Sequence, residues 1–171
     1  MNKNLILINE FLDYKEYTRR CSPNTIRAYK NDLIQYLDFL VESETNLLDC
    51  KSKHIQHYLG RIGKNNISNR SMARKLASIK SFYKYMANNK IIPINIARTI
   101  KSPKIPKRLP NFLTVKEIRN LLDYPYGDSI KDTRDRLVLE LFYSTGIRIS
   151  ELVQIRIQDI DFSSKLIKIK G

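Results

Sequence analysis

The most informative stretch of the chain is residues 145–152, which read Thr145-Gly146-Ile147-Arg148-Ile149-Ser150-Glu151-Leu152. It follows an apolar run over 137–143 that is apolar enough to form a buried helix, and Gly146 interrupts that run. Arg148 is therefore expected at a helix start on a rigid core, where a guanidinium can hold a phosphate with two parallel hydrogen bonds. Arg148 and Glu151 are three residues apart, so they share a face if helical, and the alternative is a surface turn with an ordinary ion pair.

The sequence after residue 113 has the signals of a second domain. Thr114-Val115-Lys116-Glu117 has the form of a capping box at a helix start. Asp132 is expected to cap the buried helix that ends before Gly146. Residues 160–162 and 166–170 alternate in the manner of strands, with two serines as the turn between them. The second of these strands has the pattern of an edge strand whose partner in the sheet is missing.

Residues 1–100 have the pattern of an all-helical domain. Ser22-Pro23 supplies a cap residue followed by proline at the first helical position. Apolar residues recur at helical spacing behind it. The expected helices cover residues 5–17, 23–40, 52–62 and 68–88. The predicted fold class is mainly α, with this four-helix domain followed by the first helices and first β-hairpin strands of an α+β domain.

The positive charge of the chain is concentrated in one window. The net charge is +14, and residues 50–116 contain no acid but 16 of the 31 Lys and Arg residues. A solvated basic face is the usual explanation of a short run of charge. A window of this length would repel itself without a polyanion, so the sequence predicts nucleic-acid binding.

The helix expected over residues 68–88 separates its charges from its apolar side chains. The apolar arc consists of Met72, Leu76, Ile79, Phe82, Tyr83 and Met86. The opposite side carries Arg70, Arg74, Lys80 and Lys84, with the small residues Ala77 and Ser81 between them. Lys75 departs from the pattern and lies at the edge of the apolar arc. Because the helix has no acid for i,i+4 pairs, its basic side is predicted to contact DNA, the alternative being an ordinary solvated face.

The stretch from Lys101 to Pro110 predicts a linker. Its three prolines exclude a regular helix or a central strand and make a semi-rigid spacer. Its cations are Lys101, Lys104, Lys107 and Arg108. The expected organisation is a helical domain over 1–100, a basic linker over 101–113 and a second domain over 114–171. Such a tether suits two modules that clamp a duplex, although an ordinary linker with incidental lysines is the alternative.

Cys50, His54 and His57 give the spacing Cys-x3-His-x2-His, which resembles part of a zinc site. Zinc needs three or four ligands within tetrahedral reach, and the other cysteine, Cys21, is distant in sequence. A partly buried helix face is therefore expected there, and no metal. Two cysteines indicate no disulfide framework, and the chain shows no signal peptide or membrane-spanning run, so a cytoplasmic location is expected.

Several segments closely resemble the tyrosine recombinases, the phage-integrase family, especially its Xer type. The first catalytic box of that family resembles Arg134-Asp135-Arg136-Leu137, Tyr143-Ser144-Thr145-Gly146-Ile147-Arg148-Ile149-Ser150-Glu151-Leu152 and Ile160-Asp161-Phe162. The start of its helical core-binding domain, which is SAM-like, resembles Ser22-Pro23-Asn24-Thr25-Ile26-Arg27-Ala28-Tyr29-Lys30-Asn31-Asp32-Leu33. Residues 74–85 and 111–114 also stand in the family order.

Family catalysis uses two arginines, a lysine, a histidine, a further histidine or tryptophan, and a tyrosine nucleophile. By resemblance, Arg148 matches the first catalytic arginine and Glu151 the acidic residue of the same box. In the family the other groups lie beyond a Gly-Lys-Gly-type turn, which would begin at Lys170-Gly171. Tyr143 is expected to pack within its helix. Residues 1–171 alone are therefore expected not to cleave DNA, because the nucleophile, the lysine and His-x-x-Arg are missing.

The resemblance implies site-specific DNA recombination through a 3′-phosphotyrosyl intermediate, with no metal or nucleotide cofactor. It implies double-stranded DNA as partner and homo- or hetero-oligomers, tetrameric on DNA in the complete enzyme. The residues expected to bind DNA are Thr25, Arg27, Lys30, Arg70, Arg74, Lys80, Lys84, Lys101, Lys104, Lys107 and Arg108. The alternatives are a non-catalytic DNA-binding regulator or recombinase remnant, and a helical transcription factor, which would not explain residues 145–152.

Overall fold

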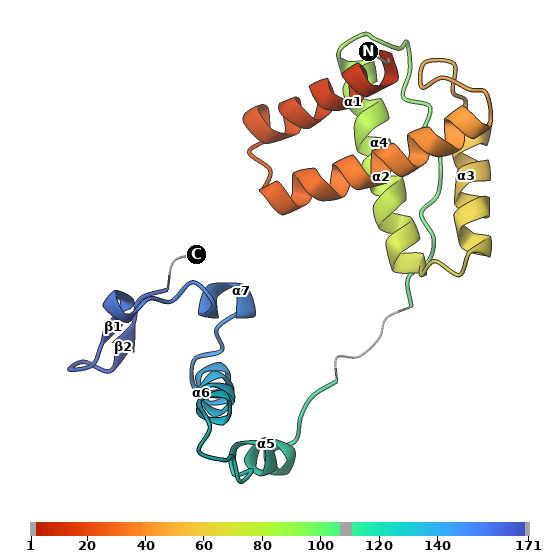
Figure 1. The fold of residues 1–171 in the computed structure, drawn as a ribbon. Helices are drawn as coiled ribbons and strands as arrows, with labels where there is room; N and C mark the ends of the chain where they lie inside the picture. Colours follow the sequence, from red (N-terminus) through yellow and green to blue (C-terminus); the bar gives the residue numbers. More distant parts are fainter. Residues whose placement is uncertain (1–2, 107–110, 170–171) are drawn as a thin grey trace. The chain divides into compact units, whose positions relative to one another are not determined.

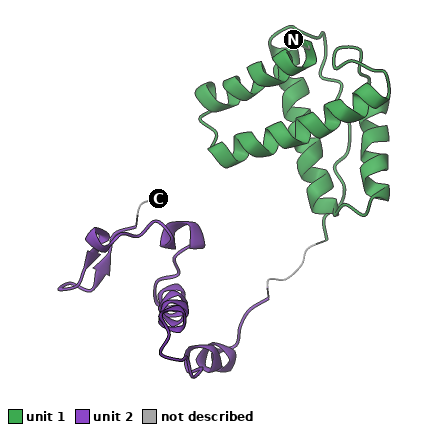
Figure 2. Ribbon diagram, in the orientation of Figure 1, with its two compact units in different colours: residues 1–108 green, residues 109–171 purple. Residues whose placement is uncertain are grey.

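A computed structural model describes residues 3–106 and 111–169 of the chain (Figure 1). The chain divides into two compact units, residues 1–108 and residues 109–171 (Figure 2). The predicted fold class is confirmed, since helices dominate the described residues and the strands form one small antiparallel sheet.

Unit 1 contains the four predicted helices. They are α1 (Lys3–Asp13), α2 (Pro23–Glu42), α3 (Ser52–Lys64) and α4 (Asn69–Asn88). The first helix was expected to continue regularly to Tyr17, but after α1 the chain widens into a π-helical turn, η1 (Tyr14–Thr18). The cap predicted for α2 is present, because the Ser22 hydroxyl accepts a hydrogen bond from the backbone N–H of Thr25 at 3.3 Å.

The apolar faces of these helices meet in one core. Figure 1 shows α2 lying across α4, and α1 and α3 pack against the same pair. Of the apolar arc predicted for α4, Met72 is partly buried and the other members are fully buried. Phe11 of α1 meets Phe82 of α4 edge to face, with ring centroids 5.4 Å apart. These contacts fix how the basic side of α4 is presented to solvent.

The chain after α4 returns along unit 1. Ile92, Ala97 and Ile100 are buried in the same core. The Ser52 hydroxyl donates to the carbonyl of Ile96 at 2.6 Å. Asn69 at the start of α4 donates its side-chain N–H to the carbonyl of Lys104 at 3.0 Å. The first residues of the predicted linker therefore lie against unit 1.

One buried ionic network crosses the core. Asp32 of α2 is 1% exposed, and its carboxylate accepts from Arg74 Nη1 at 2.5 Å, Ser78 Oγ at 2.8 Å and Lys75 Nζ at 3.3 Å. Lys75 is itself 5% exposed and also donates to Gln35. The departure of Lys75 from the wheel of α4 is thus explained by an acid on the facing helix.

Removing the acid of this network and removing its buried lysine should have unequal effects on the free energy of unfolding. Asp32→Ala should lower the free energy of unfolding by about 3–5 kcal/mol, because it leaves the Lys75 ammonium buried without its counter-charge. Lys75→Met should cost no more than about 1 kcal/mol, because Asp32 keeps Arg74 and Ser78 and a buried ammonium is removed. Urea unfolding followed by circular dichroism measures both, and equal losses would contradict this account of the network.

Unit 2 begins with helices and ends with a hairpin. Its elements are α5 (Val115–Leu122), α6 (Ile130–Thr145), α7 (Ile149–Leu152), the 3-10 turn η2 (Ile157–Asp159), β1 (Ile160–Asp161) and β2 (Leu166–Ile167). The capping box predicted before α5 is confirmed, since Thr114 N donates to Glu117 at 2.7 Å and Glu117 N donates to Thr114 Oγ1 at 3.3 Å. The predicted hairpin is also confirmed, with Ile160 paired to Ile167.

Two expectations about α6 were wrong. Its cap is Ser129, whose hydroxyl accepts from the backbone N–H of Asp132 at 3.1 Å, so Asp132 lies inside the first turn. The helix is also not buried, since Leu137 is 56% and Tyr143 is 61% exposed. Among residues 111–169 only Asp159 is buried. An apolar run shows that a helix needs a partner, but the described part of unit 2 provides no layer that covers it.

Within the described residues, no helix combines the length and the apolar character that crossing a membrane requires.

Candidate nucleic-acid interface and arginine site

The cations predicted to bind DNA are spread over the surface of unit 1. Arg70 and Lys84 of α4 are exposed, Lys80 is half-buried, and the Arg74 side chain is 51% exposed. On α2, Thr25, Arg27 and Lys30 are exposed. Lys101 and Lys104 are exposed on the returning segment, whereas Lys107 and Arg108 lie outside the described residues.

A groove of about 370 Å³ brings together two of these residues from different helices. Thr25 contributes from the start of α2 and Arg74 from α4. The rest of its lining is Asn24, Ala28, Tyr29, Ala77 and Ser78. Arg27, Lys30, Arg70 and Lys80 do not line it. The hydroxyl of Thr25 lies 3.0 Å from that of Ser22 and helps to close the α2 cap.

Lys84 belongs to a second groove that the sequence did not predict. It shares a hollow of about 250 Å³ with Lys15 and Arg19 at the end of the first helical segment. The Lys15 ammonium lies 5.3 Å from the centroid of the Tyr29 ring, and Arg19 Nε donates to the Tyr14 hydroxyl at 2.8 Å. Lys15 and Arg19 were missed because both lie outside the acid-free window, and Lys15 is directly followed by Glu16. Only the fold shows that they flank α4.

The helix α4 holds no acid of its own, as the sequence shows, but Arg74 has an acidic partner on the facing helix. Asp32 comes from α2 and forms a salt bridge with Arg74, a contact that the sequence analysis did not predict. A signal was available in the sequence. Asp32 lies at helical spacing between Tyr29, Leu33 and Tyr36, and Lys75 lies beside the apolar arc of α4. Opposite charges on two apolar faces predict a buried pair.

Arg148 is the N-cap residue of the short helix α7, with extended backbone angles (φ −78°, ψ 150°). Gly146 makes this entry possible, because it ends α6 in the left-handed region (φ 65°) that other residues adopt only with strain. The Glu151 carboxylate accepts from the backbone N–H of Arg148 at 2.9 Å and from its Nη1 at 2.8 Å. Glu151 therefore binds both the backbone and the side chain of the arginine.

This arrangement leaves most of the guanidinium accessible. The Arg148 side chain is 81% exposed, and a guanidinium carries five N–H donors. Arg148 lowers the pKa of the Glu151 carboxyl below its ordinary value through its hydrogen bonds. The bond from its backbone N–H has the larger effect on this pKa, and the bond from its side chain adds to it. Glu151 is thus held as a carboxylate, and the outer donors of Arg148 can meet a second anion. The ion pair between Arg148 and Glu151, which the sequence left as an alternative, is present. The part of unit 2 that carries it is exposed, whereas a rigid core was expected.

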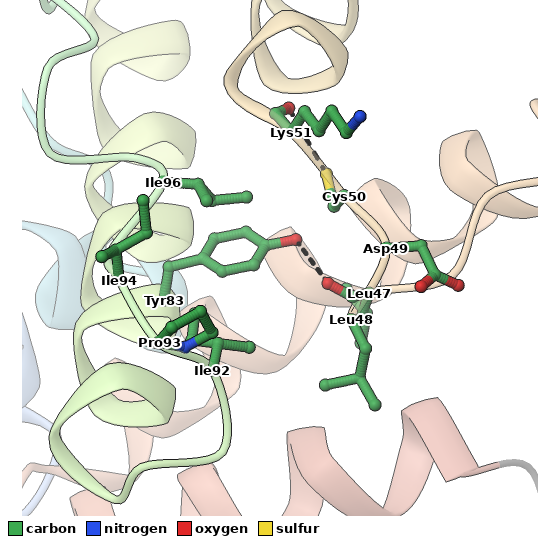
Figure 3. Close-up of a pocket in the computed structure, with 10 residues that line it drawn as sticks. All are labelled: Leu47, Leu48, Asp49, Cys50, Lys51, Tyr83, Ile92, Pro93, Ile94 and Ile96. Carbon is green, nitrogen blue, oxygen red and sulfur yellow. Dashed lines mark hydrogen bonds between the residues drawn. The ribbon is translucent and has the colours of Figure 1, made fainter.

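The Cys50 region is a structural part of unit 1. A pocket of about 490 Å³ lies between residues 47–51 and 92–96 (Figure 3). At this pocket the Tyr83 hydroxyl donates to the carbonyl of Leu47 at 3.2 Å. The Cys50 thiol lies 2.8 Å from the Tyr36 hydroxyl, and burial raises the pKa of this thiol. His54 Nδ1 accepts from the backbone N–H of Lys51 at 3.1 Å. Over the described residues, no group of three or more His, Cys, Asp or Glu could hold a metal ion.

Comparison with known proteins places both units in one family. Residues 8–90 match the phage integrase N-terminal SAM-like domain, and residues 111–171 match the phage integrase family. The tyrosine recombinase XerC of Myxococcus xanthus is 40% identical over 166 residues, which are 96% of this chain and 55% of that protein. A tyrosine recombinase of Pseudothermotoga lettingae is 38% identical over 165 residues, with 95% and 56% covered.

One solved structure agrees at the level of fold. The integrase from mycobacterium phage Brujita matches with a TM-score of 0.54 at 17% identity, over 99% of this chain and 55% of that one. The chain spans about half the length of the curated relatives that it matches. The family resemblance of residues 22–33 and 143–152 is thus confirmed, and the chain belongs to the phage integrase family of tyrosine recombinases.

Proposed function

We propose that this protein acts in site-specific DNA recombination and that unit 1 binds duplex DNA. The observation that carries the proposal is the set of exposed cations on α2 and α4 in a chain of this family. Phosphate contacts of this kind supply most of the affinity for a duplex and do not depend on its sequence. The proposed domains are residues 1–100, a basic linker over 101–113, and residues 114–171, in line with the two compact units.

Arg148 is the residue that we assign to the reaction itself. Attack of a tyrosine hydroxyl on a DNA phosphodiester would form a 3′-phosphotyrosyl bond and release a 5′-hydroxyl. In the rejoining step that 5′-hydroxyl would attack the 3′-phosphotyrosyl bond of the partner strand, which forms a new phosphodiester and releases the tyrosine. Negative charge develops on the non-bridging oxygens during each attack. A guanidinium positioned beforehand stabilises that transition state more than the ground state. Glu151 would orient Arg148 for this role. We also propose that the protein forms homo- or hetero-oligomers on DNA.

The proposal predicts how affinity responds to salt. For residues 1–171 and a mixed-sequence duplex, the logarithm of the binding constant should fall linearly with the logarithm of salt concentration. Arg70→Ala and Lys84→Ala should each make that slope shallower by about one, because each removes one phosphate contact. Fluorescence anisotropy over a salt series gives the slopes.

Lys53→Ala is the matched control. Lys53 is exposed on α3, in a shallow hollow that Glu44 and Asp49 also line, so its removal should leave the slope unchanged. A flat salt response of the unaltered protein would refute DNA binding by unit 1. Binding without strand cleavage, in a polypeptide of the full length of its relatives, would instead favour a non-catalytic DNA-binding regulator.

A further inference from the structure

The three partners of the Asp32 carboxylate differ in where they lie. Lys75 and Ser78 are buried, whereas the Arg74 side chain is 51% exposed at the wall of the groove between α2 and α4. Asp32 itself is fully enclosed, so its position is set by the helix packing. The exposed guanidinium is therefore attached at one end to a fixed point inside the core.

The contact uses only part of the guanidinium. Nη1 of Arg74 donates to Asp32 Oδ2 at 2.5 Å, and a guanidinium has five N–H donors in a rigid planar fork. Once Nη1 is fixed, the plane of the group is restricted and its other donors remain for a ligand in the groove. Ala28 and Ala77 line the same groove, and their small side chains leave room for a phosphate group to approach.

The charge balance of the network favours this role. An acid beside a DNA-binding arginine would ordinarily weaken its attraction for phosphate. Here Lys75 lies 3.3 Å from the same carboxylate, so Asp32, Arg74 and Lys75 together carry one net positive charge. The charge of Arg74 is therefore retained while its conformational freedom is reduced, and less entropy is lost when it binds an anion.

We propose that Asp32 is a positioning residue that holds the Arg74 guanidinium over the groove between α2 and α4 to receive a backbone phosphate of duplex DNA. The inference rests on the proposed function of unit 1. Asp32 is buried and would touch no DNA itself. It would raise the affinity for DNA only by holding Arg74 in place.

The test compares two carboxylates on the same helix. Asp32→Asn and Asp38→Asn each remove one negative charge from α2, but Asp38 is exposed and forms no salt bridge with Arg74. Affinity of residues 1–171 for a mixed-sequence duplex is measured by anisotropy, at a temperature where circular dichroism shows each variant folded. The dissociation constant of Asp32→Asn should exceed that of Asp38→Asn by about fivefold, the cost of ordering one free arginine.

The same comparison in an Arg74→Ala background separates positioning from a general effect on structure. There the ratio should fall to about one, because nothing is left for Asp32 to position. A ratio near one with Arg74 present, or one that persists without Arg74, would overturn the inference. Failure of the unaltered protein to bind the duplex at all would instead refute the proposed function.

A second pair of variants covers the case in which Asp32→Asn does not fold. Asp32→Asn/Lys75→Met keeps the buried site electrically neutral, and Asp38→Asn/Lys75→Met is its matched control. A ratio above one, abolished by Arg74→Ala, is expected from this pair. It should be smaller than fivefold, because without Lys75 the Asp32 carboxylate of the control partly offsets the charge of Arg74. Equal affinities of the two double variants would again contradict a positioning role.

Discussion

Residues 1–108, produced as a separate polypeptide, are expected to unfold in one cooperative transition, whereas residues 109–171 should show none. All the buried hydrophobic side chains among the described residues belong to unit 1. In unit 2 even large apolar residues are open to solvent, with Ile130 91% and Phe112 82% exposed. Since burial of apolar surface is the main favourable term in folding, unit 2 has little to offset the entropy of its chain.

Thermal melts followed by circular dichroism, together with amide hydrogen exchange, measure this difference. Unit 1 should protect the amides of α2 and α4 strongly, and unit 2 should exchange within the dead time of the experiment. A cooperative melt of residues 109–171 alone would contradict the expectation. The groove that Leu141, Ile155 and Ile167 help to line, about 490 Å³ in volume, is part of the apolar surface that unit 2 leaves uncovered.

The second large effect concerns Arg148. In a polypeptide that can cleave DNA, Arg148→Lys should slow strand cleavage by at least ~10²-fold, the usual loss when one oxyanion donor is removed. Lysine keeps the charge but loses the planar fork, so DNA binding should stay within a few fold. A suitable protein joins residues 1–171 to the part of the Myxococcus xanthus relative outside its matched residues. Formation of a covalent protein–DNA adduct gives the rate.

Arg156→Lys is the control for this measurement. Arg156 is an exposed arginine of the same unit, directly before the turn η2, and its replacement should leave the rate unchanged. Cleavage by the Arg148→Lys protein at nearly the original rate would remove Arg148 from the reaction. An adduct formed by residues 1–171 without any addition would show that the nucleophile lies within them.

The parts of the fold that the sequence predicted are those with local causes. Ser22 and Thr114 cap helices because a hydroxyl next to a helix start reaches the free N–H groups of the first turn. The hairpin turn follows similarly, since the Asp161 carboxylate accepts from the backbone of Ser163 at 2.9 Å. These signals act within a few residues, so they can be read without the tertiary structure.

The parts that were not predicted depend on neighbours distant in sequence. Arg74 and Asp32 are 42 residues apart, so the charge pattern of α4 alone left the arginine without a partner. Lys15 joins Lys84 only because the first helical segment passes α4. The apolar run in α6 predicted burial, but burial requires a covering layer as well as an apolar face. In each case the missing information was which surfaces meet.

The thiol enclosed between α2 and the loop before α3 has a practical consequence. Cys50 is 5% exposed and its pKa is raised by burial, so it presents little of the thiolate that reacts with alkylating reagents. Cys21, between η1 and α2, is only partly covered. A reagent can reach the Cys50 sulfur only once the helices have separated, whereas it can reach the Cys21 sulfur without that event. The alkylation rate of Cys50 would therefore report how often unit 1 opens, and that of Cys21 would serve as the internal reference.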